Sequence, residues 1–322
     1  MRPDLSLTRG RWCASALVAL STLGCMAAET APSAEGAGAT GDGGAGLVGG
    51  TGGSAGVGGT GGTGGDGATG GSAAAGGSGG DCPDGVICVT QFPYEHSGTT
   101  TGAASDQLDS YSCDPSIDES GPEVIYRVDL PSDGFLALEL PEAELGPGAD
   151  IDVHLLQDLD AGTCLDRGHW RAGSLLAAGR YWVTADTWVA DGGQQSDGSY
   201  TLTFGLTTVA DLTSMGMDAT VATDALWAFD TAWTAGEALH FAYAVTDFAV
   251  PSNQRRLWLL SLASGALLHH EYVSHGDMSS DPNDSRLAVS FSNVPESHKS
   301  SLGVMRGGEA YTGSYGYSMR LD

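Results

Sequence analysis

The chain has 322 residues with 40 acidic and 13 basic side chains, which gives a formal net charge of −27 at pH 7. Counterion release from a nucleic acid requires a basic face. Outside the first dozen residues the basic side chains form no cluster, so we expect no nucleic-acid partner. Most of the 50 glycines lie in one block, and the rest of the chain is long enough for two cores of about 110 to 120 residues each.

Residues 1–25 predict an export signal rather than part of the fold. Three arginines among the first eleven residues precede an apolar run at 13–23, which is too short to span a bilayer. The run ends in Thr-Leu-Gly-Cys, which resembles a bacterial lipoprotein signal, although Thr22 stands at a position usually taken by leucine. On this interpretation Cys25 is lipidated and anchors the chain in a membrane. The alternative is an ordinary signal that is cleaved near Ala27.

Residues 26–81 consist mainly of Gly, Ala, Ser and Thr, with almost no large side chain. Such a segment cannot bury a core, so we expect a disordered linker. A Gly-rich coil of this length has a root-mean-square span on the order of 35–40 Å, enough to hold the folded part clear of a membrane. The G-x-S-x-G run at 52–56 lacks the flanking strand and helix that a nucleophile elbow requires.

From 82 to 206 the chain predicts a disulfide-stapled β-sandwich. Apolar and polar residues alternate in five short runs separated by Gly, Pro and Asp, the pattern of strands with one face in a core and one in water. These runs begin at Val124, Leu136, Ile151, Tyr181 and Tyr200.

Four cysteines follow the linker, and an even number in an exported protein favours disulfides. Of the three pairings that four cysteines allow, we favour Cys82–Cys88 and Cys113–Cys164. A zinc site built on cysteines is not expected, because no C-x-x-C pair occurs.

Five segments of this region carry a family resemblance, and they lie at 108–111, 122–127, 150–153, 178–183 and 198–202. In this order they resemble the bacterial pre-peptidase C-terminal type of β-sandwich. The resemblance implies a non-catalytic accessory module that serves adhesion or spacing. Four aspartates offer oxygen ligands for calcium without the EF-hand pattern, and we favour a solvated acidic edge. They are Asp150, Asp152, Asp158 and Asp160.

The second module, 207–322, is predicted to begin with a short helix that Thr223 or Asp224 caps and Gly236 ends. Alternating residues then favour further strands, with one hairpin joined through Ser264-Gly265. The expected strands lie at 241–245, 256–262, 267–274, 289–291 and 302–305.

A second resemblance covers about 80 residues of this module. Its segments lie at 246–248, 251–258, 273–276, 290–293, 299–303, 308–311 and 316–322. Together they are similar to the N-terminal part of the murein L,D-transpeptidase catalytic domain (YkuD-like). The resemblance implies a mixed β domain acting on peptidoglycan stem peptides, in which a cysteine thiolate forms a thioester that an amine resolves.

Polar and aromatic residues in the matching loops are candidates for a substrate groove, and the alternative is turn-forming surface and core-edge packing. They are Lys299, Ser300, Tyr311 and Tyr317.

The family carries its nucleophile in a Ser-x-Gly-Cys-Pro-like loop after a His-Gly pair, and no cysteine follows Cys164 here. His275-Gly276 resembles that pair but belongs to an earlier strand end, so we assign no catalytic residue. The histidines at 269, 270 and 275 miss the i, i+4 spacing of a helical zinc site. We therefore expect no metal, no cofactor and an incomplete L,D-transpeptidase-like domain that is inactive alone.

The sequence as a whole predicts a mainly β, exported cell-envelope protein that is lipid-anchored in the outer membrane or periplasm. Its expected partners are peptidoglycan stem peptides, and its parent reaction is the crosslinking or remodelling of peptidoglycan. The alternative is a non-catalytic lipoprotein that binds peptidoglycan or the envelope.

Overall fold

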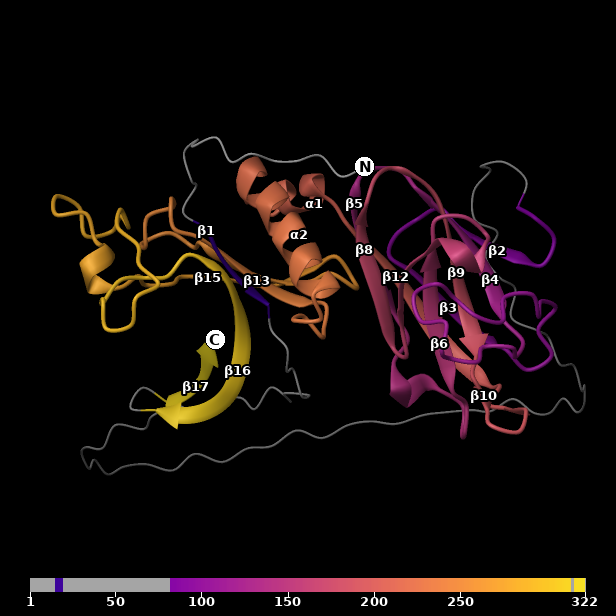
Figure 1. Cartoon of the computed structure of the whole chain (residues 1–322). Helices are drawn as coiled ribbons and strands as arrows, with labels where there is room; N and C mark the ends of the chain where they lie inside the picture. Colours follow the sequence, from indigo (N-terminus) through magenta and orange to yellow (C-terminus); the bar gives the residue numbers. More distant parts are fainter. Residues whose placement is uncertain (1–14, 20–81, 314–315, 322) are drawn as a thin grey trace, which may run out of the picture. The chain divides into compact units, whose positions relative to one another are not determined.

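The structure is a computed structural model that describes residues 15–19, 82–313 and 316–321 (Figure 1). The predicted linker and the lipidation residue Cys25 lie outside the described residues. The described chain is mainly β, as the sequence predicts, with two sheets in the first module and one in the second. Among the described residues, no helix is long and apolar enough to cross a membrane.

The first module is a sandwich of a five-stranded and a four-stranded sheet. The first has the order β2-β4-β9-β6-β7, with strands Val86–Val89, Val124–Leu130, Gly179–Thr187, Ile151–Leu156 and Cys164–Gly168. The second has the order β3-β12-β5-β8, with strands Tyr94–Thr99, Ser199–Thr207, Gly134–Glu139 and Arg171–Leu176. Pairing is antiparallel except between β2 and β4. A small hairpin of β10 and β11 joins Val189–Ala190 to Gln194–Gln195.

The core between these sheets is built by alternate residues of the strands, as the period of two predicts. Leu136 and Leu138 of β5 and Phe204 of β12 pack there with Tyr126 of β4 and Val183 of β9. All five are fully buried. The five predicted runs are strands β4, β5, β6, β9 and β12.

The expectation of one solvated face per sheet is wrong for β6, where all six residues are buried. The segment 105–123 lies over the outer face of the five-stranded sheet, so Asp152 and His154 are only 3% and 0% exposed. Backbone hydrogen bonds hold this segment, including Ser112 N to Ala161 O at 2.9 Å. The polar residues that the alternation assigns to a solvent-exposed face are therefore buried.

Both disulfides are present with the pairing that the sequence favours. Cys82 is bonded to Cys88 across six residues, and Cys113 to Cys164 across 51. The longer bridge ties the covering segment to the start of β7.

The second module begins with helices α1, Val209–Ser214, and α2, Ala219–Thr234. Asp218 caps α2 by accepting a hydrogen bond from Thr220 N at 2.8 Å. The prediction that Thr223 or Asp224 caps this helix is therefore wrong, because both lie inside it. Gly236 follows the helix with a φ of +72°, in the left-handed region, as its predicted role at the end of the helix requires.

The sheet of the second module has the order β15-β14-β13-β1-β16-β17. Its strands are Ala266–Glu271, Leu257–Ser261, Ala242–Asp247, Ser15–Ala19, Gly303–Gly313 and Gly316–Leu321. The predicted hairpin is confirmed as β14 and β15, whereas 289–291 is not a strand. β1 lies within the predicted export signal, where it is antiparallel to β13 and parallel to β16. Three single-turn 3₁₀ helices complete the description, at Glu142–Glu144, Ala161–Thr163 and Asp277–Ser279.

A second hydrophobic core lies between α2, the sheet of the second module and strand β5 of the sandwich. Phe135 of β5 and Phe229 of α2 pack there with Phe241 and Tyr243, and the rings of Phe135 and Phe229 meet edge-on at 5.0 Å. Two hydrogen bonds cross the same boundary: Leu175 N to Asp230 Oδ1 at 2.7 Å and Trp233 Nε1 to Asp166 Oδ2 at 2.8 Å.

Candidate functional site

The loops between β15 and β16 converge on Ser300. Its hydroxyl accepts a hydrogen bond from Gly276 N at 2.9 Å, and its amide donates to Ser279 Oγ at 2.8 Å. Gly276 is needed at this contact, because a Cβ there would lie 2.4 Å from the carbonyl oxygen of His298. Ser300 therefore ties its own loop to the segment 276–279, with part of its hydrogen-bonding capacity already used.

The other candidate groove residues are spread around this region. Lys299 is half-buried beside Ser300. Tyr311, on β16, is 42% exposed and lies against the guanidinium of Arg320, while Tyr317, on β17, is 67% exposed. The register pairs Tyr311 with Ser318 and Thr312 with Tyr317, so the two tyrosines point to opposite faces of the hairpin.

His275 belongs to an arrangement centred on the fully buried Arg256. The guanidinium donates from Nη2 to His275 Nδ1 at 2.9 Å, from Nη1 to Val250 O at 2.8 Å and from Nε to Val273 O at 3.0 Å. The proton of the neutral imidazole is then on Nε2, which faces Ser280 Oγ at 3.1 Å. Burial and the charge of Arg256 lower the pKa of His275, so the ring stays neutral and fixed.

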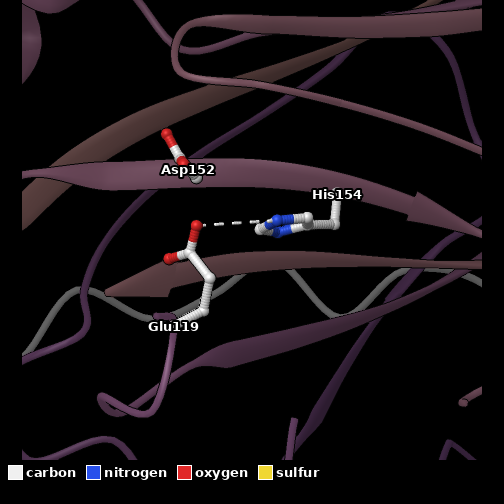
Figure 2. A group of neighbouring side chains, drawn as sticks. All are labelled: Glu119, Asp152 and His154. Atoms are coloured by element: carbon white, nitrogen blue, oxygen red, sulfur yellow. Dashed lines mark ion pairs between the residues drawn. The ribbon is translucent and has the colours of Figure 1, made fainter. Parts of the chain in front are cut away.

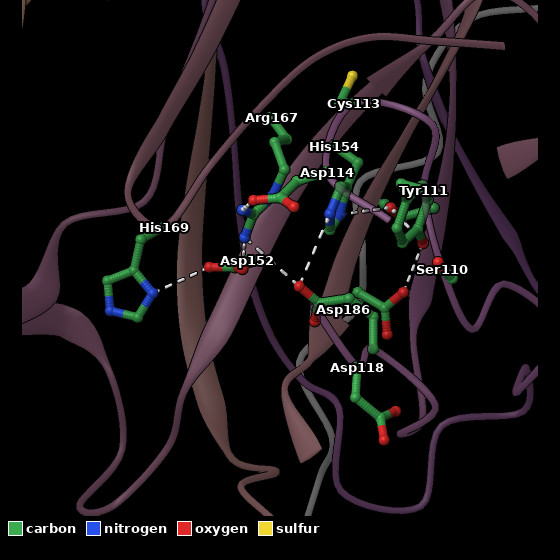
Figure 3. A network of polar contacts seen from close by, with 12 residues as sticks. Ser110, Tyr111, Cys113, Asp114, Asp118, Asp152, His154, Arg167, His169 and Asp186 are labelled. Carbon is green, nitrogen blue, oxygen red and sulfur yellow. Dashed lines mark hydrogen bonds and ion pairs between the residues drawn. The ribbon is translucent and has the colours of Figure 1, made fainter. Parts of the chain in front are cut away.

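A network of buried polar side chains lies on the outer face of the five-stranded sheet (Figure 3). The strand register places Asp152 opposite Asp186, and His154 opposite both Thr184 and Arg167. These residues share a face because they occupy alternate positions on three adjacent strands.

The covering segment closes the network with two further buried side chains. The ring of Tyr111 stacks on His154 with centroids 3.6 Å apart, and its hydroxyl donates to Asp186. Glu119 lies beside the Nε2 edge of the imidazole, with Oε1 3.8 Å from His154 Nε2 (Figure 2). Arg167 Nη2 contacts Asp152 and lies 3.6 Å from Glu119 Oε1.

The carboxyl groups of this network have strongly perturbed proton affinities. Burial raises the pKa of Asp186 to about 9 despite its hydrogen bond from Tyr111. Burial and the neighbouring Asp152 raise the pKa of Glu119. Burial alone would raise the pKa of Asp152 as well, but its contact with Glu119 and the charge of Arg167 lower it. The Glu119 carboxyl therefore favours its protonated form, and the Asp152 carboxyl favours its ionised form.

Burial has the opposite effect on the pKa of the histidine in this network, and a second histidine lies at the edge of the network. Burial lowers the pKa of His154 to about 3, so its ring is neutral. His169 is at the edge of the network, with Nδ1 2.9 Å from Asp152 Oδ1 and 3.1 Å from Asp150 Oδ1.

The four aspartates considered as calcium ligands do not form one site. Asp150 and Asp152 lie at the start of β6, beside His169. Asp158 and Asp160 lie beyond the other end of the strand, where their backbone carbonyls accept hydrogen bonds from Thr163 Oγ1 at 3.0 and 2.7 Å. A strand of six residues, at about 3.3 Å per residue, separates the two pairs by roughly 20 Å.

Sequence reasoning did not identify Tyr111, Glu119, His154 or Arg167 as a site. The available signal was Asp-Val-His at 152–154, which places a carboxylate and an imidazole on one face of a strand. The alternation assigned that face to solvent, and only the covering segment reverses the assignment.

Comparison with known proteins identifies the second module. Residues 213–322 match the family model of the L,D-transpeptidase catalytic domain. This segment is therefore similar to L,D-transpeptidase catalytic domains over about a third of the chain. The match begins at the end of α1 and includes α2 and strands β13 to β17.

Two solved structures are similar to the chain at low identity. One is the pre-peptidase C-terminal domain of a collagenase from Bacillus anthracis, with 15% identity over 38% of this chain and 98% of that chain, and a TM-score of 0.25. The other is PliG, a periplasmic inhibitor of g-type lysozyme from Aeromonas hydrophila, with 12% identity, coverage of 37% and 96%, and a TM-score of 0.21. No curated protein matches the chain.

The thiol that L,D-transpeptidase chemistry needs is not found in the described part of this segment. Residues 213–322 contain no cysteine. The described cysteines, Cys82, Cys88, Cys113 and Cys164, are all in disulfides and belong to the sandwich. His275 has its Nδ1 occupied by Arg256, so in this geometry it cannot accept a proton there.

Proposed function

We propose that this chain is an exported protein of the bacterial cell envelope whose L,D-transpeptidase segment binds peptidoglycan stem peptides. The family match over 213–322 is the observation that carries the proposal. The two disulfides support export, because disulfides persist in oxidising compartments. Lipidation of Cys25 would attach the chain to a membrane, with the Gly-rich segment as a spacer.

The family reaction forms a thioester on a cysteine, and we propose that residues 1–322 bind the substrate without acyl transfer. Four of the six cysteines are in disulfides, and the other two, Cys13 and Cys25, lie in the predicted export signal. A disulfide sulfur is not a free thiolate and cannot attack a peptide carbonyl in this way. Substrate binding is therefore the activity that we assign to these residues, and the thiol step is not assigned to them.

Binding and acylation are tested separately on the full chain. The protein is sedimented with purified sacculi, and we expect it in the pellet and its release by excess soluble stem peptide. It is also incubated with a carbapenem and examined by intact-mass spectrometry, where we expect no adduct. Failure to sediment would overturn the binding proposal, and a covalent adduct would show that this polypeptide supplies a nucleophile.

Lipidation is tested by labelling cells with a palmitate analogue. The Cys25→Ala variant should lose the label, whereas the Cys13→Ala variant, altered in the same predicted signal, should keep it. Absence of the label from the wild-type chain would favour the ordinary signal cleaved near Ala27, and retention of the label by Cys25→Ala would show that another residue is lipidated.

A further inference from the structure

Three side-chain atoms that are good metal ligands converge inside the sandwich (Figure 2). A carboxylate oxygen of Glu119, one of Asp152 and the imidazole Nε2 of His154 lie within 4.8 Å of one another. The three residues are 1%, 3% and 0% exposed. We propose that Glu119, Asp152 and His154 bind a divalent transition-metal ion such as Zn²⁺. This proposal does not depend on the function proposed for the L,D-transpeptidase segment.

The first argument is that two of these residues lack partners. Within the described chain, the two carboxylate oxygens of Glu119 have no hydrogen-bond partner. The Nε2 atom of His154 has none either. Stacking on Tyr111 fixes the imidazole, and His154 Nδ1 faces Thr184 Oγ1 at 3.4 Å. Nε2 is thereby aimed at Glu119, and a buried polar atom without a partner is costly. A cation between these atoms satisfies both.

The second argument is the balance of charge. The register places the carboxylates of Asp152 and Asp186 directly opposite each other, and Glu119 lies against the same face. Asp186 is satisfied by Tyr111 and by Thr187 N at 2.8 Å, whereas Glu119 is not. Among the described residues, the guanidinium of Arg167 is the one that pairs with Glu119 and Asp152. The remaining negative charge must be balanced by protons or by a bound cation, because an uncompensated charge is strongly disfavoured in an interior.

The donor set indicates the class of ion. Calcium and magnesium take oxygen ligands, whereas an imidazole nitrogen with two carboxylates suits zinc and its neighbours in the first transition row. Metal–ligand bonds of about 2.0–2.2 Å in a tetrahedral site place ligand atoms about 3.3–3.6 Å apart. The three atoms, which lie within 4.8 Å of one another, therefore have to move closer together by up to about 1.5 Å to bind one ion.

The ion has a route and a competitor. Arg167 and Asp114, whose side chains are 19% and 40% exposed, lie between the network and a cavity of about 500 Å³ that Trp233 also lines. Movement of the Arg167 side chain would open the network to this cavity. The competitor is a proton, because a carboxyl must be deprotonated before it binds a metal ion.

The test uses the full chain, stripped with a chelator and titrated calorimetrically with ZnCl₂ near neutral pH. We expect one Zn²⁺ per chain. Glu119→Gln keeps the size of the side chain and resembles the protonated acid, and it should weaken binding by at least about tenfold. The control is Glu139→Gln, which removes an acid paired with Arg171 at 2.7 Å on the other sheet and should leave binding unchanged.

X-ray absorption on the wild-type chain provides a readout that needs no variant. We expect oxygen and nitrogen ligands with one imidazole. A second imidazole would point to His169 instead, since its Nδ1 lies 2.9 Å from Asp152 Oδ1. Undiminished binding by Glu119→Gln, a spectrum with two or more imidazoles, or a Kd for wild type weaker than about 100 µM would overturn the proposal. Such a weak Kd would mean that protons, and not a metal ion, neutralise the buried carboxylates.

Discussion

Arg256 illustrates how a single buried cation organises the L,D-transpeptidase segment. It is fully buried, and three acceptors from two loops receive its hydrogen bonds. Lysine keeps the charge but cannot reproduce the planar fork, so Arg256→Lys leaves two acceptors unsatisfied. We expect a loss of about 2–4 kcal/mol in the free energy of unfolding, measured by urea denaturation.

The neighbouring Arg255 provides the matched control for that substitution. It is exposed, and its guanidinium lies 5.7 Å from the ring of Tyr272. Arg255→Lys should change the free energy of unfolding by less than about 0.5 kcal/mol. Equal effects of the two substitutions would show that the three hydrogen bonds of Arg256 contribute little.

The buried carboxyls predict that stability falls as pH rises above neutrality. In the unfolded chain Glu119 and Asp186 titrate near pH 4, whereas both pKa values are raised in the fold, that of Asp186 to about 9. Between these limits the folded state holds more protons, so the free energy of unfolding decreases with pH. His154, with its pKa lowered to about 3, acts in the opposite sense only below its unfolded pKa of about 6.5.

The window from pH 7 to 8.5 therefore isolates the carboxyl contribution. In chelator-treated protein, Glu119→Gln should reduce the downward slope by up to about 1.4 kcal/mol per pH unit, since one proton no longer leaves the fold. Urea denaturation at several pH values measures it. Parallel slopes for wild type and variant would mean that Glu119 is already ionised in the folded chain.

At the scale of elements, the covering segment 105–123 encloses the polar network, and the disulfide Cys113–Cys164 holds it. This bridge spans 51 residues, against six for Cys82–Cys88. A longer closed loop restricts the unfolded chain more. Replacing Cys113 and Cys164 by serine should therefore lower the free energy of unfolding by about 4 kcal/mol, and replacing Cys82 and Cys88 should lower it by about 2 kcal/mol. Thermal or urea unfolding of the two double variants measures both. A larger effect of the short bridge would contradict the prediction.

The hairpin of β16 and β17 depends on an unusual partner. In the described sheet, β16 pairs with β17 and with β1, and β1 alone connects it to β13. If the predicted signal is removed, the hairpin loses that ladder and its edge is exposed. Trypsin should then cut at Arg306 and Arg320 faster in a chain that begins at residue 26 than in the precursor.

The sandwich supplies the internal control for that digestion. Arg127 of β4 and Arg171 of β8 should be cut at the same rate in both chains, since neither strand contacts β1 in the sheet order. Mass spectrometry of the fragments over time measures each site. Unchanged cleavage at Arg306 would show that the hairpin is stable without β1.

Most strands could be predicted from the sequence because their alternation reflects which face is buried. The core positions around Tyr126, Leu136 and Phe204 follow directly from that pattern. The polar site could not be predicted from the sequence. The residues around Asp152 and His154 do not indicate that a segment some 30 to 40 residues upstream covers them. The start of α2 was placed too late, since Asp218 lies before the apolar positions that signalled the helix.

At the scale of the molecule, β5 connects two cores. Its alternate residues divide between them: Phe135 and Ala137 pack with α2, whereas Leu136 and Leu138 pack between the sheets of the sandwich. Gly205 of the neighbouring β12 allows a further close approach, because a Cβ there would lie 2.0 Å from the carbonyl oxygen of Ala263. The sandwich and the L,D-transpeptidase segment therefore share a strand but not a core, and we expect this division to limit the coupling between their stabilities.

The adjacent residues Phe135 and Leu136 allow this coupling to be tested. Phe135→Ala should leave a cavity beside Phe229 and Phe241 and cost about 3–5 kcal/mol, chiefly in the segment that contains α2. Hydrogen exchange by mass spectrometry should then show faster exchange in α2, β13 and β14, with β4, β6 and β9 little changed. Leu136→Ala, on the opposite face of the same strand, should instead increase exchange in the strands of the sandwich. Equal exchange of all elements in both variants would mean that the two cores unfold as one unit and that β5 does not divide them.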